Sequence, residues 1–162
     1  MRKAVLCLLL ASFTSSVLVF GQGAEGSKSR RYITLSRPEG ASHLPYSDAV
    51  RDGDTLYIAG RIGLDPNTGN APADVDTELR YLFDEFGAVL QRADMDWDDL
   101  VSVQVFCTDL NLYSKFNDTY RAKFRLDFPA RAFIGAGSLL RGGHFEMMGI
   151  ARKHTVIRKG KK

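Results

Sequence analysis

Two stretches of helical periodicity, each set between strand-like segments, constrain the fold of this chain more than any other feature. In residues 75–93, apolar side chains recur at three- and four-residue steps, the spacing of one helix face; they are Val75, Leu79, Leu82, Phe83, Phe86, Val89 and Leu90. A second helix is predicted where an apolar residue recurs at every fourth position, at Leu112, Phe116, Tyr120 and Phe124. We expect Asn111 to cap this helix and Pro129 to end it.

Short segments rich in β-branched and aromatic residues precede, separate and follow the two helices. Asp52-Gly53 is a hairpin signal between two of them, and the Pro, Asn and Gly of residues 65–72 predict a loop. The predicted strands are YITLS (32–36), two runs within 45–60, LVSVQVFCTDL (100–110), residues 131–137 and residues 144–151. Within residues 100–110, alternation predicts one shared face for Val101, Val103, Val105 and Cys107.

The resulting order, β-β-β-α-β-α-β-β, indicates an α+β fold with a single sheet and both helices packed on one face. The 162 residues fit one domain, which we expect to span residues 32–158. No further helix is predicted to cover the other face of the sheet. An uncovered face would expose a large apolar patch, so the sequence predicts self-association.

The N-terminus has the composition of a secretory signal peptide. A basic MRK is followed by a mostly apolar stretch and then by small residues. We expect residues 1–21 to be removed, with a cut before Ala24 as an alternative, and residues 22–31 to form a flexible lead-in. An uncleaved membrane anchor is the other interpretation, although the apolar stretch is short for a span. Export predicts a periplasmic or secreted protein that has no membrane segment after cleavage.

Charge and cysteine content exclude several other classes of function. Loss of Arg2 and Lys3 with the signal segment leaves 20 basic and 19 acidic residues, so the net charge falls from +3 to +1. A basic tail at residues 159–162 is interpreted as a solvated end, and nucleic-acid binding is not predicted. Cys107 would be the one remaining cysteine, which excludes an internal disulfide and favours a core role. The three histidines lack the spacing of a metal site.

Four segments resemble the RidA family, also called the YjgF or reactive-intermediate deaminase family. They are LPYSDAV, YIAGRIGLDPNTG, DLVSVQVFCTDLNLYSKFNDTYRAKF, and PAR followed by the closing strand MMGIA, which together span residues 44–153. The resemblance implies a chorismate-mutase-like α+β fold assembled as a homotrimer, with ligand sites in the clefts between subunits. It also implies hydrolysis of a small 2-imino or enamine carboxylate to the 2-keto acid and ammonia, without a metal or cofactor.

Residues that match the family's site are Arg131, Tyr46 and Asn117. Arg131 matches an arginine that clamps the carboxylate of a 2-imino or 2-keto acid; a structural ion pair with Glu146 or with an acid of a neighbouring subunit is the alternative. Tyr46 matches an aromatic residue that lines the cleft from the adjacent subunit, and interface packing is its alternative. Asn117 matches a helix asparagine, which could equally hold a backbone bond.

The chain departs from the family in its closing strand. The family's deaminases carry E-x-E-A-I-A there, the second acid holding the attacking water, whereas this chain has Glu146 and Met148 at the two positions. Methionine is only a weak acceptor, and Glu146 shares its face of the strand about 6.5 Å away. Glu146 is the candidate catalytic carboxylate only if the water sits at a different place from that in the family's deaminases. Met148 and Phe133 are expected to line the cleft and make it more apolar.

Two functions therefore remain open. The first is an exported deaminase, and the second is a small-carboxylate binding protein that is non-catalytic or differently specific. The family's other label, endoribonuclease, is not favoured, because an exported protein rarely meets RNA and the mature chain has no basic stripe apart from its tail.

Overall fold

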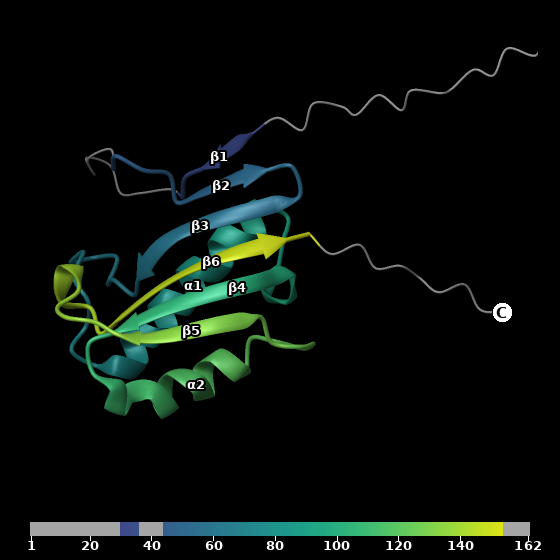
Figure 1. The fold of residues 1–162 in the computed structure, drawn as a ribbon. Coiled ribbons are helices and arrows are strands. Elements are labelled where there is room, and N and C mark those ends of the chain that lie inside the picture. The colour runs from purple at the N-terminus through teal and green to yellow at the C-terminus, as the bar shows by residue number, and fades with distance from the viewer. Residues whose placement is uncertain (1–29, 36–43, 154–162) are drawn as a thin grey trace, which may run out of the picture.

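The computed structural model describes residues 30–35 and 44–153, which form one six-stranded sheet in the order β1-β2-β3-β6-β4-β5 (Figure 1). Neighbouring strands are antiparallel, except that β4 and β5 are parallel and are connected through α2. The elements are β1 (Arg31–Ile33), β2 (Ala49–Asp52), β3 (Thr55–Ile62), α1 (Val75–Arg92), β4 (Leu100–Cys107), α2 (Tyr113–Arg121), β5 (Ala130–Gly135) and β6 (Phe145–Arg152). The predicted order of strands and helices is confirmed.

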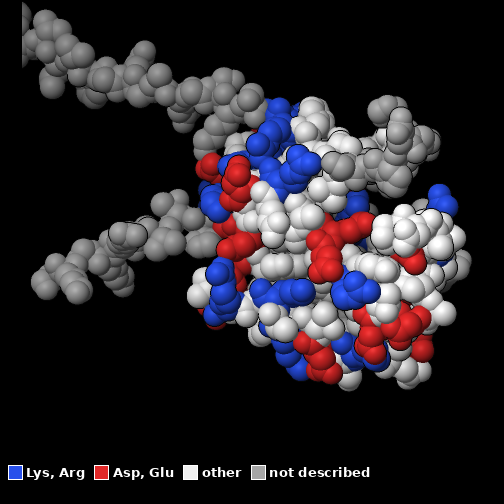
Figure 2. Space-filling model, turned by 180° about the vertical axis from the view of Figure 1, so that it is seen from behind, with Lys and Arg blue, Asp and Glu red and all other residues white. Residues whose placement is uncertain are grey.

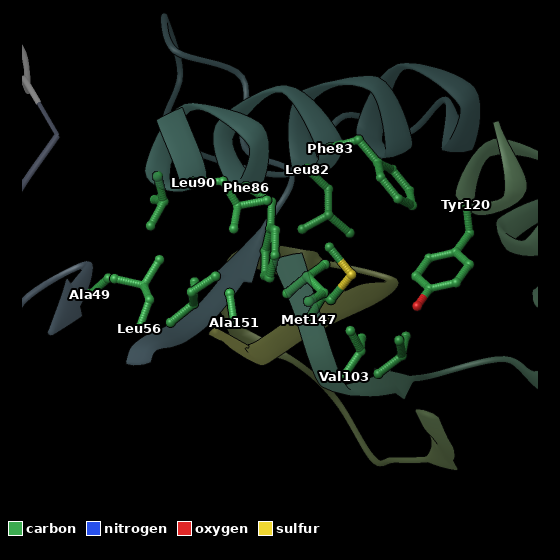
Figure 3. Close-up of a cluster of buried hydrophobic side chains, with 14 of the residues drawn as sticks. Ala49, Leu56, Leu82, Phe83, Phe86, Leu90, Val103, Tyr120, Met147 and Ala151 are labelled. Carbon is green, nitrogen blue, oxygen red and sulfur yellow. The ribbon is translucent and has the colours of Figure 1, made fainter. Parts of the chain in front are cut away.

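Both helices pack on the same face of the sheet, as predicted. Phe83 of α1 and Phe116 of α2 contact each other, with 5.4 Å between ring centroids. Side chains from α1 point toward those of the strands, among them Met147 and Val103 (Figure 3). All four of these residues are buried. The core is therefore a single layer between the two helices and one face of the sheet.

Polar groups at both ends of α1 explain where this helix begins and ends. At the start, the Asp74 carboxylate accepts a hydrogen bond from the Thr77 amide at 2.9 Å, which caps the first turn. At the end, three cationic side chains donate to the carbonyls of residues 92, 93 and 94 at 2.6–2.8 Å; they are Arg31, Arg51 and Lys153. Cations at this end also suit the helix dipole, and the predicted end near Ala93 is confirmed.

The predicted cap of the second helix is wrong. Asp109 caps the short turn before α2: its carboxylate accepts a hydrogen bond from the backbone amide of Asn111 at 2.9 Å, and α2 itself has no side-chain cap. Asn111 therefore lies inside a 3₁₀ turn, Leu110–Leu112, and α2 begins after that turn at Tyr113. The Asp109 carboxylate, two residues earlier, already serves as the acceptor for the free amide, so Asn111 lies inside the turn and does not cap it.

The predicted end of the second helix is also wrong, because α2 ends at Arg121, well before Pro129. The chain after it is held by Asp98, which accepts hydrogen bonds from the Arg125 amide at 3.0 Å and from Arg125 Nε at 2.8 Å. A tertiary ion pair, and not the proline, fixes the path into β5.

Val101 does not share a face with Val103, Val105 and Cys107, contrary to the prediction. It is 49% exposed, whereas the other three are buried. The pairing of β4 with β6 shifts between Leu100 and Ser102. This bulge adds one residue to β4. The residues at the start of the strand therefore face the side opposite to the one that strict alternation predicts.

A buried carboxylate on α1 holds the chain where it enters β6. Glu78 Oε1 accepts hydrogen bonds from the backbone amides of His144 and Phe145 at 2.7 and 3.0 Å. Glu78 Oε2 lies 2.6 Å from His144 Nδ1. Since β6 carries Glu146 and Met148, Glu78 sets the position of both from the opposite side of the sheet.

Several predictions fall on residues outside the described ranges. These are the signal segment 1–21, most of the lead-in 22–31, and the tail 159–162. Within residues 30–35 and 44–153, no helix is long and apolar enough to span a membrane. On the face seen in Figure 2, basic and acidic side chains are intermixed.

Candidate functional site

Arg131 lies on β5 and points toward α2. In the parallel pairing of β4 and β5 it stands opposite Val103, which is buried beneath the helices. Residues opposite each other in a sheet share a face, so the guanidinium enters the space between the last strand and α2. Its Nη2 donates a hydrogen bond to Asn117 Oδ1 at 2.7 Å.

Four aromatic rings surround this guanidinium. Its central carbon lies 4.5 Å from the ring centroid of Tyr120 and 5.6–5.8 Å from those of Tyr113, Phe116 and Phe133. We call these four rings the aromatic cage. Ring faces attract a cation at such distances. In the described part of the chain, no carboxylate forms an ion pair with Arg131, so the predicted alternative of a pair with Glu146 does not occur within one chain.

Two polar atoms in the cage are buried and have no hydrogen-bond partner within the described residues, Arg131 Nη1 and the Tyr120 hydroxyl. A buried donor without a partner typically costs about 1–3 kcal/mol. Burial raises the pKa of Tyr120 to about 12, so its hydroxyl stays protonated at neutral pH. A ligand oxygen would satisfy the unpaired N–H of the arginine.

Asn117 links the arginine to Tyr113. It is buried, and its side-chain oxygen serves Arg131 instead of a backbone group. A side-chain hydrogen bond with Asn117, and then the charge of Arg131, lower the pKa of Tyr113 below its ordinary value. The predicted site residues Arg131, Asn117 and Phe133 therefore belong to one cluster.

Glu146 and Met148 lie on the opposite face of the sheet. Along β6, Phe145 and Met147 are buried beneath the helices, so the alternate positions face away from them. Glu146 is partly buried, and Met148 is 36% exposed. Within one chain the structure therefore does not bring these two residues together with Arg131.

A bulge in β3 lies beside Glu146. The pairing of β3 with β6 shifts between Ile58 and Arg61, and this places Gly60 against the Glu146 side chain. A Cβ atom at position 60 would collide with Glu146 Oε1, so the glycine leaves room for the carboxylate in its present position. In the described residues the Glu146 carboxylate has no hydrogen-bond or ion-pair partner.

Tyr46 lies in the turn before β2 and is half exposed. Two residues later, the buried Asp48 carboxylate accepts hydrogen bonds from Arg61 Nη1 and from the Leu35 amide. Arg61 Nη2 also donates to Glu85 of α1 at 2.5 Å. This charge network ties the Tyr46 turn and the β3 bulge to α1.

Sequence reasoning missed the aromatic cage and the charge network. Tyr113, Asn117 and Tyr120 follow one another at four- and three-residue steps, so helical spacing could have placed them on one face. The pairing of Asp48 with Arg61 had no comparable signal, because it depends on the bulge. Cys107 is buried and donates to the Asp109 carbonyl, as expected for a core cysteine.

Comparisons with known proteins identify the family of this chain. The family described as "Endoribonuclease L-PSP" matches residues 35–153. The 2-iminobutanoate/2-iminopropanoate deaminase of Capra hircus is 36% identical over 123 residues, which is 75% of this chain and 89% of the goat protein. The chain belongs to the RidA/YjgF family.

Solved structures of the family show the same fold. The YjgF gene product of E. coli is 31% identical and superposes with a TM-score of 0.68 over 76% of this chain and 99% of that one. E. coli TdcF, solved with bound serine, is 26% identical with a TM-score of 0.68 over 76% of this chain and all of the other. The predicted fold class and family are therefore confirmed.

Proposed function

We propose that this protein is an exported RidA-family deaminase that hydrolyses small 2-imino or enamine carboxylates to 2-keto acids and ammonia. The observation that carries the proposal is Arg131, a partly buried guanidinium whose Nη1 is buried and unpaired, in an aromatic cage. An arginine fork is suited to a carboxylate. The proposal also draws on relatives named 2-iminobutanoate/2-iminopropanoate deaminase and on TdcF, a relative solved with a small amino carboxylate.

The proposed site lies between subunits of a homotrimer. Arg131 is on the helix side of the sheet, and Glu146 and Met148 are on the other side, so one copy alone cannot offer both groups to one small ligand. The outer face also exposes apolar side chains, such as Tyr57 and Val101 at 51% and 49%. A neighbouring copy would cover this face and bring its own Glu146 toward Arg131. Tyr46 would line the same cleft.

In the proposed reaction, Arg131 holds the carboxylate of the substrate, and a backbone carbonyl orients the imine nitrogen. Glu146 positions the water and accepts its proton as the oxygen attacks the imine carbon. Its carboxylate suits this role because it has no partner among the described residues. Phe133 and Met148 would contact the apolar part of the substrate.

A binding protein without catalysis is the second candidate, and Met148 is the observation that favours it. The family's deaminases carry a second acid at this position, which the resemblance gives the role of holding water. A thioether cannot take a proton from water. Such a protein would keep the clamp at Arg131 and bind a 2-keto or 2-imino acid without turnover.

Export to the periplasm or the exterior is proposed from the composition of residues 1–21. Expression of the full chain and sequencing of the N-terminus of the mature protein test it. A new N-terminus at Gln22 or Ala24 in the exported fraction is expected, and an intact Met1 would overturn export by cleavage.

Ammonia release from enzymatically generated iminopropionate tests the deaminase directly. We expect purified residues 22–162 to accelerate release, and Arg131→Ala and Glu146→Gln to abolish the acceleration. Arg80→Ala, at an exposed arginine on α1, is the matched control. No turnover by the natural protein, with activity appearing in Met148→Glu, would favour the binding protein. No turnover by either would contradict the deaminase.

A further inference from the structure

Tyr113 is a phenol beside Arg131 that the proposed mechanism leaves unused. It begins α2 and is 46% exposed, unlike the buried Tyr120. Its ring contacts the edge of Phe133 at 4.9 Å between centroids, and the Arg131 guanidinium carbon lies 5.8 Å from its centroid. Tyr113 is therefore the cage member best placed to touch both solvent and a ligand held by the arginine.

Asn117 neighbours both this phenol and the guanidinium. Arg131 Nη2 donates to the side-chain oxygen of Asn117 at 2.7 Å, and Tyr113 precedes Asn117 by one helical turn on the same face of α2. With its oxygen occupied by Arg131, the amide group of Asn117 can donate a hydrogen bond through its nitrogen to the phenol oxygen. Such a bond stabilises the oxygen when it carries negative charge.

The pKa values of Tyr113 and Tyr120 are shifted in opposite directions. The hydrogen bond with Asn117 and the charge of Arg131 lower the pKa of Tyr113, with a smaller effect from Arg121 on its own helix. Burial instead raises the pKa of Tyr120. Below its pKa, Tyr113 carries a proton that is easier to give up than that of an ordinary phenol.

We propose that the Tyr113 hydroxyl donates a proton to the nitrogen of a 2-imino acid whose carboxylate is bound at Arg131. The inference rests on the proposed deaminase function and adds a proton donor to it. The carboxylate and the imine nitrogen of such a substrate sit on adjacent carbons, so a group bordering the clamp can reach the nitrogen.

The proton transfers balance without another reactant. Water oxygen bonds to the imine carbon and gives a proton to Glu146, while the electrons of the C=N π bond move to nitrogen, which takes the proton of Tyr113. In the resulting carbinolamine the C–N bond breaks and the C=O bond forms. The hydroxyl proton returns to the Tyr113 oxygen, and the departing nitrogen takes the proton from Glu146, leaving as ammonia.

The test compares the purified protein with Tyr113→Phe, which keeps the ring and removes the hydroxyl. Tyr81→Phe on α1 is the matched control. Loss of a general acid typically lowers the rate by about 10²-fold or more. We expect kcat for ammonia release to fall by about this factor, KM to change little, and the alkaline limb of the kcat profile to disappear. The control should retain both kcat and the profile.

A second measurement does not depend on turnover. Titration of ¹³C-labelled tyrosine by NMR should show one phenol that ionises below its ordinary pKa of 10.0, absent in Tyr113→Phe and shifted upward in Asn117→Ala. Natural protein that turns over, with Tyr113→Phe matching it in kcat and pH profile, would overturn the inference alone. Absence of turnover in the natural protein would overturn the deaminase and this inference together.

Discussion

Replacement of Glu78 by alanine should destabilise the protein strongly, although this residue lies outside the proposed site. Its carboxylate accepts two backbone hydrogen bonds, from His144 and Phe145, and it is fully buried. Each buried amide left without a partner costs about 1–3 kcal/mol. The expected loss in free energy of unfolding is therefore about 3 kcal/mol, or roughly 6–12 °C in Tm for a domain of this size.

Urea and thermal denaturation of three variants test this magnitude. Glu78→Gln keeps one carbonyl oxygen as an acceptor, so about half of the loss is expected. Asp84→Ala removes an exposed carboxylate from the same helix and should change stability by less than about 0.5 kcal/mol. If Glu78→Ala were as stable as Asp84→Ala, the idea that Glu78 anchors the start of β6 would be wrong.

Further predictions concern the charge network and the ion pair after α2. Asp48→Asn and Arg61→Gln should each destabilise the protein by up to about 3–5 kcal/mol, because each breaks the buried ion pair between these two side chains. The double variant should lose less than the sum of the two losses; additive losses in urea denaturation would contradict the coupling. The Arg125 backbone amide and guanidinium lower the pKa of Asp98 below 3.8. The resulting stability should be complete above about pH 5 and be lost as pH falls below 3.8 and through the lowered pKa of the folded state, so Asp98→Asn should lose less stability on acidification than the natural protein.

The elements that local pattern determines were predictable from the sequence. The helix at 75–92 was found because its apolar side chains repeat over five turns, and the hairpin at Asp52-Gly53 because that dipeptide suits a tight turn. The resemblance identified Arg131, Asn117 and Phe133, and the structure brings these three into one cluster. Glu146 and Met148 were correctly placed on a common face by strand alternation.

The remaining features depend on contacts between segments far apart in the chain. Val101 was misplaced because a bulge in β4 is set by its pairing with β6. The ion pair between Asp98 and Arg125 leaves no local signal, so the sequence predicts Pro129 as the end of the helix. The role of Tyr113 likewise becomes visible only when β5 brings Arg131 against α2.

The central claim is that Arg131 binds a small carboxylate. Calorimetric titration of the purified protein with 2-ketobutanoate, beside Arg131→Ala and the control Arg80→Ala, tests it most directly and applies whether or not the protein is a catalyst. The account predicts saturable binding at one site per chain in the natural protein and the control, and none in Arg131→Ala. Unchanged binding in Arg131→Ala would contradict it.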